Sequence, residues 1–147
     1  MKNTKKIGVM GCGAVANYGH LPAIAETEGL ILAAVYDPNV EALQRVKEKY
    51  PDVNVFTKEE DFFKSGIDAI SITSPAPCHK KNVLEAAQYK LPVICEKPLA
   101  MNQEEALEMI EATERAGTSL YTAFCYRFSK SALKIRELVQ NKAIGEV

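Results

Sequence analysis

The sequence has almost no excess of charge of either sign, and this excludes several classes of partner. Its 18 lysines and arginines nearly balance its 19 aspartates and glutamates, so the formal net charge at pH 7 is -1. Acidic and basic residues are interspersed, without the basic stripe that binds nucleic acid or an anionic membrane surface. We therefore expect neither nucleic acid nor a membrane as a partner.

Metal-binding and disulfide patterns are also missing. The four cysteines, at positions 12, 78, 95 and 125, form no C-x-x-C pair, and there are only two histidines. This excludes the common zinc spacings, so no metal site is predicted. Scattered cysteines are typical of reduced thiols, and we expect a cytoplasmic protein.

Long hydrophobic runs are absent too. No segment approaches the roughly 18 consecutive apolar residues of a membrane-spanning helix. Lys2, Lys5 and Lys6 precede an apolar run, Ile7–Met10, in the manner of a secretion signal. Gly8 interrupts that run, which is too short for an h-region of about 7–15 residues. The length of 147 residues suits a single domain, 1–147, with a sizeable core.

What the chain does contain is an alternation of strand-like and helix-like segments. The apolar segments expected to be strands are 7–10, 30–37, 53–56, 68–72, 91–95 and 119–124. Amphipathic segments separate them, for example 40–50, where Leu43, Val46 and Tyr50 share one helical face. This alternation predicts an α/β fold, a doubly wound parallel sheet (Rossmann) of about six strands with helices on both faces.

Three further expectations concern chain segments near helix ends. Thr57 and Glu60 form the pattern of a capping box at the start of a short helix. A last helix, beginning at Ser129, is expected to turn Ile135, Leu138 and Val139 toward the core. Residues 145–147 resemble the start of another strand.

The first predicted strand runs into a glycine-rich turn, GCGAVA, at residues 11–16. A G-x-G-x-x-A pattern between a strand and a helix is the context of the dinucleotide fingerprint. Gly11 would permit the tight turn, Gly13 would let a pyrophosphate approach the backbone, and Ala16 would allow close helix packing. The N–H groups of the following helix would then face the phosphate oxygens. The alternative is an ordinary glycine-rich turn of an α/β protein.

The second predicted strand ends in an acid. Asp37 lies 24 residues after Gly13, near the spacing of the carboxylate that accepts hydrogen bonds from the adenosine ribose. A carboxylate there would repel a 2′-phosphate, so it favours NAD over NADP. The alternative is that Asp37 belongs to a turn and caps the next helix.

Two loops follow later strands at the edge of the sheet where ligands bind in such folds. The first, 73–79, has the sequence TSPAPCH, and its two prolines exclude continuation of the strand. The second begins with Glu96, Lys97 and Pro98, directly after the fifth predicted strand.

These segments together resemble the Gfo/Idh/MocA family of nicotinamide-dependent oxidoreductases. The matching segments are GCGAVANYGHLPAI, the acid Asp37, SITSPAPCH, CEKPLA, and YRF followed by a helix ending in IGEV. They follow the family's order from residue 7 to 147, and Glu-Lys-Pro is the most specific of them. The resemblance covers the amino-terminal half of a family member, so it implies a dinucleotide-binding domain. It also implies that the family's carboxy-terminal substrate domain is absent from this chain, which would lack a complete active site.

The resemblance implies a role for each matching residue. The residues implied to bind the cofactor, NAD or alternatively NADP, are Gly11, Gly13, Ala14, Val15, Ala16, Asp37, Ser74, Pro75, His79, Glu96 and Lys97. Lys97 is the implied catalytic residue, because its ammonium would hydrogen-bond the hydroxyl that becomes a carbonyl. Tyr126 and Arg127 would begin the substrate pocket, and the Lys97–Pro98 bond is expected to be cis. The implied function is hydride transfer between NAD(P) and a sugar, inositol or related polyol, in a homo-oligomer.

Alternatives stay open for several of these residues and for the function. Lys97 could be an ordinary surface lysine, His79 a helix cap, and Arg127 one half of a surface ion pair. We expect His20 to pack against its helix or loop rather than act as a ligand or base. We expect Cys12 and Cys95 to pack rather than react. The functional alternatives are a nucleotide-binding module without turnover and a methyltransferase, whose glycine loop is similar.

Overall fold

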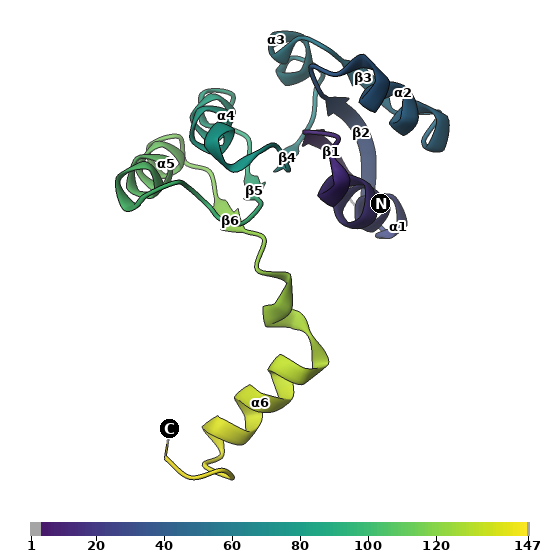
Figure 1. Cartoon of the computed structure of the whole chain (residues 1–147). Helices are drawn as coiled ribbons and strands as arrows, with labels where there is room; N and C mark the ends of the chain where they lie inside the picture. Colours follow the sequence, from purple (N-terminus) through teal and green to yellow (C-terminus); the bar gives the residue numbers. More distant parts are fainter. Residues whose placement is uncertain (1–3, 147) are drawn as a thin grey trace.

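The computed structural model describes residues 4–146 and has one parallel β-sheet at its centre (Figure 1). The strands are β1 (Lys5–Met10), β2 (Leu30–Tyr36), β3 (Asn54–Phe56), β4 (Ala69–Ile72), β5 (Val93–Cys95) and β6 (Leu120–Thr122). Their order is β3-β2-β1-β4-β5-β6, with every neighbouring pair parallel. The chain therefore starts in the middle, moves outward to β3 and returns beside β1. This confirms the predicted doubly wound sheet and places its switch point between β1 and β4.

Helices cover both faces of the sheet, as predicted. They are α1 (Leu21–Glu26), α2 (Val40–Lys49), α3 (Glu59–Phe63), α4 (Ala76–Gln88) and α5 (Gln103–Arg115). The first two pack in one core cluster, which includes Leu21 and Val46. The other three pack in a second cluster, which includes Phe62 and Met109. Right-handed crossovers that leave the centre of a sheet in opposite directions put their helices on opposite faces, which explains the two clusters.

The predicted capping box at Thr57 was wrong. Helix α3 begins one residue later than the pattern requires, with Lys58 at the N-cap position and no side-chain capping bond. Phe62 and Phe63 of this short helix are both buried. Their packing sets the position of α3, so tertiary contacts override the local capping pattern.

The predicted inward face of the last helix was also wrong. Helix α6 (Lys130–Gln140) does begin after Ser129, whose hydroxyl accepts a hydrogen bond from the Ala132 N–H at 3.2 Å. However, none of its residues is buried. The 3-10 turn η2 (Cys125–Phe128) leads the chain away from the sheet. Residues 125–146, which include η2 and α6, therefore project from the sheet, and we call this segment the stalk (Figure 1). Ile135, Leu138 and Val139 therefore have no core to face.

The chain after α6 adds no strand in the part that the structure describes. Gly145 and Glu146 lie outside regular secondary structure, and Val147 lies outside the described residues. No helix between residues 4 and 146 has both the length and the apolar character needed to cross a membrane.

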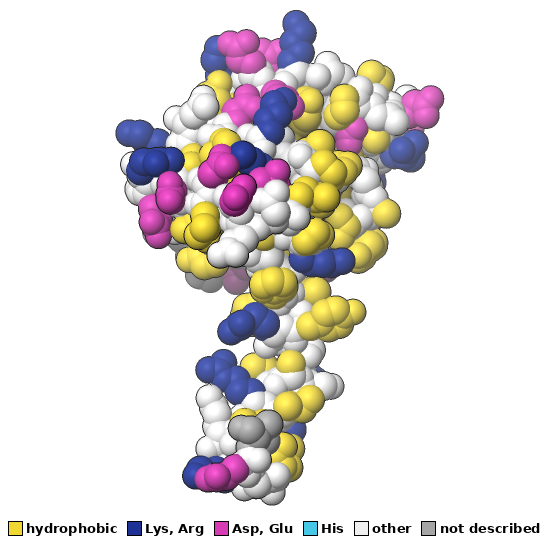
Figure 2. Space-filling model, turned by 60° about the vertical axis from the view of Figure 1, so that its left-hand side comes forward, with side chains coloured by type: hydrophobic (Ala, Val, Ile, Leu, Met, Phe, Trp, Pro, Cys, Tyr) yellow, Lys and Arg dark blue, Asp and Glu magenta, His cyan; other side chains and the backbone are white. Residues whose placement is uncertain are grey.

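The stalk carries large apolar side chains on its surface (Figure 2). Phe128 in η2 is 79% exposed and Ile135 in α6 is 60% exposed, and Phe124 and Tyr126 are exposed beside them. Several large exposed apolar side chains on one projecting segment promote association in water.

We expect the chain to self-associate through this stalk in concentrated solution. The double substitution Phe128→Ser and Ile135→Ser should shift the population toward monomer, because it removes apolar surface without touching the core. Sedimentation velocity over a concentration series measures the effect, and Lys130→Ser, in the same exposed segment, is the matched control. A wild-type chain that stays monomeric throughout the series would contradict the expectation.

Candidate functional site

A cleft of about 520 Å³ opens beside the switch point of the sheet. The residues that line it are Met10, Gly11, Gly13, Tyr36, Asp37, Pro38, Glu59, Thr73, Ser74, Pro75, Cys78, Lys81 and Asn82. They come from the ends of β1, β2 and β4 and from helices α3 and α4. Among the residues predicted to bind a cofactor, the cleft thus brings together Gly11, Gly13, Asp37, Ser74 and Pro75.

Gly11 lines the cleft at the point where two loops touch. Its φ is +98°, and a Cβ at this position would lie 2.7 Å from the backbone nitrogen of Ser74. Thr73 stabilises this close contact between the two loops by donating its hydroxyl to the Gly11 carbonyl at 2.6 Å. Only glycine fits both the conformation and the contact, which confirms the predicted tight turn.

Gly13 differs from Gly11 because the protein itself does not require glycine there. A Cβ at Gly13 would meet no atom within 4 Å, and the residue is not among those with positive φ. Gly13 nevertheless lines the cleft. The bare backbone therefore leaves open space on the side from which a ligand would approach.

The loop that carries Gly13 is braced by the helix that follows it. Asn17 donates its side-chain amide to the carbonyls of Cys12 and Gly13, both at 2.8 Å. Ala16 is fully buried in the same core cluster as Val9 of β1, as expected for a small residue that allows close helix packing. Contacts within the protein therefore hold the glycine loop in place.

The beginning of this helix is wider than an ordinary α-helix. Its first turns start at Ala14 and Val15 and continue as a π-helix, η1 (Ala16–His20), directly into α1. Pro22 has no N–H for an i→i−4 bond, and the turn before it closes instead from the Leu21 N–H to the Ala16 carbonyl. Ala14 and Val15 lie outside the lining of the cleft.

Asp37 lies on the wall of the cleft and joins the end of β2 to the glycine loop. Its Oδ2 accepts a hydrogen bond from the Cys12 N–H at 2.7 Å, and its Oδ1 accepts one from the Asn39 N–H at 2.8 Å. Asn39, not Asp37, caps helix α2, through bonds from the N–H groups of Glu41 and Ala42. The alternative of Asp37 as the helix cap is therefore wrong.

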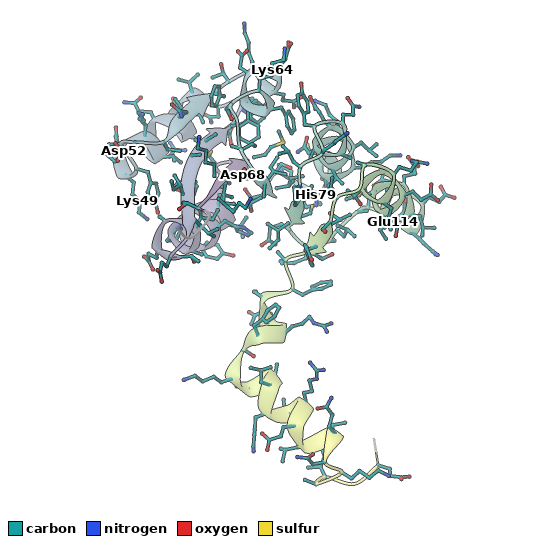
Figure 3. The ribbon with its side chains drawn as sticks, turned by 180° about the vertical axis from the view of Figure 1, so that it is seen from behind. Lys49, Asp52, Lys64, Asp68, His79 and Glu114 are labelled. Atoms are coloured by element: carbon teal, nitrogen blue, oxygen red, sulfur yellow. The ribbon has the colours of Figure 1, made fainter. Side chains whose placement is uncertain are left out.

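His79 lies in the body of the domain (Figure 3) and is only 1% exposed. Its Nδ1 is 2.9 Å from the Pro98 carbonyl oxygen and its Nε2 is 2.8 Å from that of Ser74. The imidazole thus lies between the loop after β4 and the loop after β5, and a neutral ring, with one N–H, donates to one of these two acceptors. It does not line the cleft, so a cofactor contact by this side chain stays a prediction.

Glu96 and Lys97 follow β5 at the same edge of the sheet as the glycine loop. The Lys97–Pro98 bond is cis, as predicted. Glu96 Oε1 lies 2.8 Å from Nε2 of His20, and the other nitrogen of that ring lies 2.7 Å from the Ser71 hydroxyl. We expected His20 to pack against its helix or loop rather than act as a ligand or base, and the structure adds that its ring forms a hydrogen-bonded bridge. No local pattern indicates this pair, because 76 residues separate its members.

The two residues predicted for the substrate pocket lie apart from the cleft. Tyr126 and Arg127 belong to η2, at the base of the stalk, and both are exposed. A role in substrate binding stays a prediction for them.

Comparison with known proteins identifies the family. The family described as "Oxidoreductase family, NAD-binding Rossmann fold" (Gfo/Idh/MocA) matches residues 5–124. The chain belongs to this family. Myo-inositol 2-dehydrogenase of Thermotoga maritima is 31% identical over 142 residues, which make up 96% of this chain and 42% of the relative. D-glucoside 3-dehydrogenase of Escherichia coli is 31% identical over 143 residues, 97% of this chain and 41% of the relative.

Solved structures show the same fold. An oxidoreductase from Agrobacterium radiobacter, crystallised with NAD+, L-tartaric acid and magnesium, has a TM-score of 0.90 and 25% identity; the match covers 97% of this chain and 42% of that one. The apo scyllo-inositol dehydrogenase of Lactobacillus casei has a TM-score of 0.92 at 23% identity, over 99% of this chain and 44% of that one. The chain thus spans less than half the length of these relatives.

This Gfo/Idh/MocA chain has cleft residues that the sequence analysis missed. Lys81 of α4 and Glu59 of α3 form an ion pair with 2.6 Å between Nζ and Oε2, and both line the cleft. Tyr36 donates its hydroxyl to the other Glu59 oxygen at 3.4 Å. Burial, and then the nearby Glu59 carboxylate, raise the pKa of Tyr36, so it stays a neutral donor. These residues come together only when α3 and α4 pack on the same face.

A second hollow, of about 350 Å³, lies on the sheet face that carries α1. Apolar residues such as Ile7, Ile24 and Ile94 line most of it, with His20 and Tyr121 among the remainder. It does not include the glycine loop or Asp37, so it is separate from the cleft.

Two buried cysteines, Cys12 and Cys95, lie near the site, and their thiols are expected to be poor nucleophiles. Burial raises the pKa of Cys12 to about 12, with a further contribution from the Asp37 carboxylate. Burial likewise raises the pKa of Cys95 to about 12, and Glu96 adds to the effect. Because the thiolate is the nucleophile, these thiols are unreactive at neutral pH. This agrees with the expectation that both cysteines pack.

We expect Ellman's reagent to titrate Cys78 and Cys125 quickly in the native chain, because both are exposed, and Cys12 and Cys95 only slowly. A thiol with a pKa of about 12 is ionised at pH 8 in about one molecule in ten thousand. All four should react at once in denaturant, which serves as the control. Fast native labelling of Cys12, located by mass spectrometry, would contradict the burial.

Proposed function

We propose that this chain binds NAD in the cleft beside the switch point, as the nucleotide-binding domain of a sugar or inositol dehydrogenase. The observation that carries the proposal is that Gly13 lines the cleft at a position where a Cβ would meet no atom of the protein within 4 Å. Membership of an NAD-binding oxidoreductase family supports it. So does the relative from Agrobacterium radiobacter, which was crystallised with NAD+.

The residues of the cleft suit the parts of this cofactor. Asp37 would accept hydrogen bonds from the adenosine ribose hydroxyls, as acids at this position do in dinucleotide-binding folds. The pyrophosphate would lie against the bare backbone of Gly13 and the free N–H groups at the helix start. Ser74 and Pro75 line the cleft from the loop after β4, the strand that neighbours β5 in the sheet. The nicotinamide half would lie beyond these two residues, toward Glu96 and Lys97, which follow β5 and do not themselves line the cleft.

Bound NAD supplies a hydride acceptor for a substrate carbinol carbon. In this proposal the Lys97 ammonium donates a hydrogen bond to the substrate hydroxyl and stabilises the negative charge that develops on its oxygen. Lys97 is exposed at the carboxyl edge of the sheet, so its side chain is free to meet a substrate. Tyr126 and Arg127 would contribute to the adjoining substrate surface.

The substrate class comes from the relatives, which are named for inositols and a D-glucoside. The chain covers about 42% of such a relative. We therefore assign it cofactor binding and propose that a second domain supplies most of the substrate surface. Calorimetry with NAD tests the binding, because the sequence has no tryptophan to report it by fluorescence.

Gly13→Ala should weaken NAD binding at least tenfold, which is about 1.4 kcal/mol, and leave the free energy of urea unfolding nearly unchanged. The methyl group would meet no atom of the protein but would enter the space in which the proposed pyrophosphate lies. Gly11→Ala is the contrast: its positive φ and the contact with Ser74 predict a loss of about 1–3 kcal/mol of stability. Unchanged NAD affinity in folded Gly13→Ala would overturn the proposed binding mode.

Asp37→Asn should weaken NAD about tenfold while weakening NADP less, because the charge that repels a 2′-phosphate is gone. Asparagine keeps an oxygen that can accept from the Cys12 N–H. Asp68→Asn is the matched control, since Asp68 accepts from the Lys6 N–H at 2.7 Å at the opposite edge of the sheet. If the affinity ratio of the two cofactors stays the same in calorimetry, Asp37 has only a structural role.

A further inference from the structure

His20 connects three parts of the fold next to the cleft: the turn after the glycine loop, β4 and the residue after β5. It lies at the end of the π-helical turn that follows the glycine loop. Its Nδ1 is 2.7 Å from the hydroxyl of Ser71 in β4, and its Nε2 is 2.8 Å from Oε1 of Glu96, just after β5. The side chains of His20 and Glu96 are 14% and 13% exposed, and Ser71 is 1% exposed. The bridge is therefore largely shielded from water.

The chemistry of the three groups fixes the direction of one bond. A carboxylate only accepts, so Nε2 of His20 carries a proton and donates it to Glu96. The Ser71 hydroxyl can donate to Nδ1 and hold the ring in that tautomer. The other Glu96 oxygen, Oε2, accepts from the backbone N–H of Lys97 at 3.0 Å. Both oxygens of this carboxylate are thus engaged, one by His20 and one by Lys97.

The turn that carries Lys97 is held from two sides by histidines. His20 holds it through Glu96, and His79 lies 2.9 Å from the carbonyl oxygen of Pro98. Lys97 itself lies between these two anchors with an exposed side chain. The backbone at Lys97 is therefore fixed while its ammonium remains available.

We propose that His20 is a positioning residue, which holds the Glu96 carboxylate and through it the backbone of Lys97 against the nicotinamide half of the cofactor. This inference rests on the proposed function, because it needs NAD in the cleft. Loss of the imidazole leaves a mostly buried carboxylate oxygen without its donor, and such a group moves toward water or another partner. The turn at Lys97 then loses its place relative to the glycine loop, while the glycine loop itself is unaffected.

The test compares NAD with ADP-ribose, which lacks the nicotinamide ring, in calorimetry on the 147-residue chain. His20→Leu should weaken NAD about tenfold and ADP-ribose by less than about twofold. His20→Gln should recover most of the loss, because its amide can donate where Nε2 does. His20→Asn reaches only the position of Nδ1, near Ser71, and should behave like His20→Leu. It also serves as the second variant if the leucine chain does not fold.

The outcomes separate a positioning role from a structural one. Equal weakening of NAD and ADP-ribose, or no weakening of either, would overturn the inference while leaving cofactor binding intact. Failure of both ligands to bind the wild-type chain would overturn the proposed function and this inference with it.

A second measurement needs no cofactor. The chain has only two histidines, so nitrogen-15 spectra of the imidazoles can be assigned with His20→Asn. We expect the His20 signals to report a proton on Nε2, and Glu96→Ala to shift the Nε2 signal, because the acceptor of that proton is lost while Ser71 still donates to Nδ1. An equal mixture of tautomers in the wild type would overturn the bridge to Glu96.

Discussion

The site depends on the close approach of two backbone segments at the switch point of the sheet. Gly11 and Ser74 come so near that a single methyl group would not fit between them. The Thr73 hydroxyl fastens this contact through the carbonyls of Met10 and Gly11, at 3.2 and 2.6 Å. Because the ends of parallel strands collect at one edge, this contact brings the loops after β1 and β4 together around one cleft.

Two different kinds of restraint hold the two halves of the site. The half proposed for adenosine and pyrophosphate is built from backbone groups, with Asp37 and Asn17 tying the glycine loop to its surroundings. The half proposed for nicotinamide is built from side chains, with His20 and His79 holding the turn at Lys97. A site built from backbone groups suits the pyrophosphate and ribose, because these parts are common to all dinucleotides. A side-chain framework around one lysine suits a step that needs an exact orientation.

Much of the fold and half of the site follow from local features of the sequence. The glycine turn, the acid after β2 and the loops after β4 and β5 all fall where the sequence analysis expected them, and the cleft gathers Gly11, Gly13 and Asp37. The two predictions about helices that were wrong, on the cap of α3 and the inward face of α6, depend on tertiary contacts that a local pattern does not contain. Thr57 matches a capping pattern, but the burial of Phe62 and the residue after it places α3 differently. Nor does an amphipathic pattern reveal that α6 has no partner in the described chain.

The sequence by itself determined the alternation of strands and helices, the sharp turn at Gly11 and the family. Hydrophobic periodicity and backbone sterics act between near neighbours, so they can be read along the chain. Only the tertiary structure decided that His20 pairs with Glu96, that Lys81 pairs with Glu59 across the cleft, and that His79 bridges two loops. The physical reason is that a hydrogen bond depends on the distance and angle between two atoms. For residues far apart in the chain, only the packed sheet and its helices set that geometry.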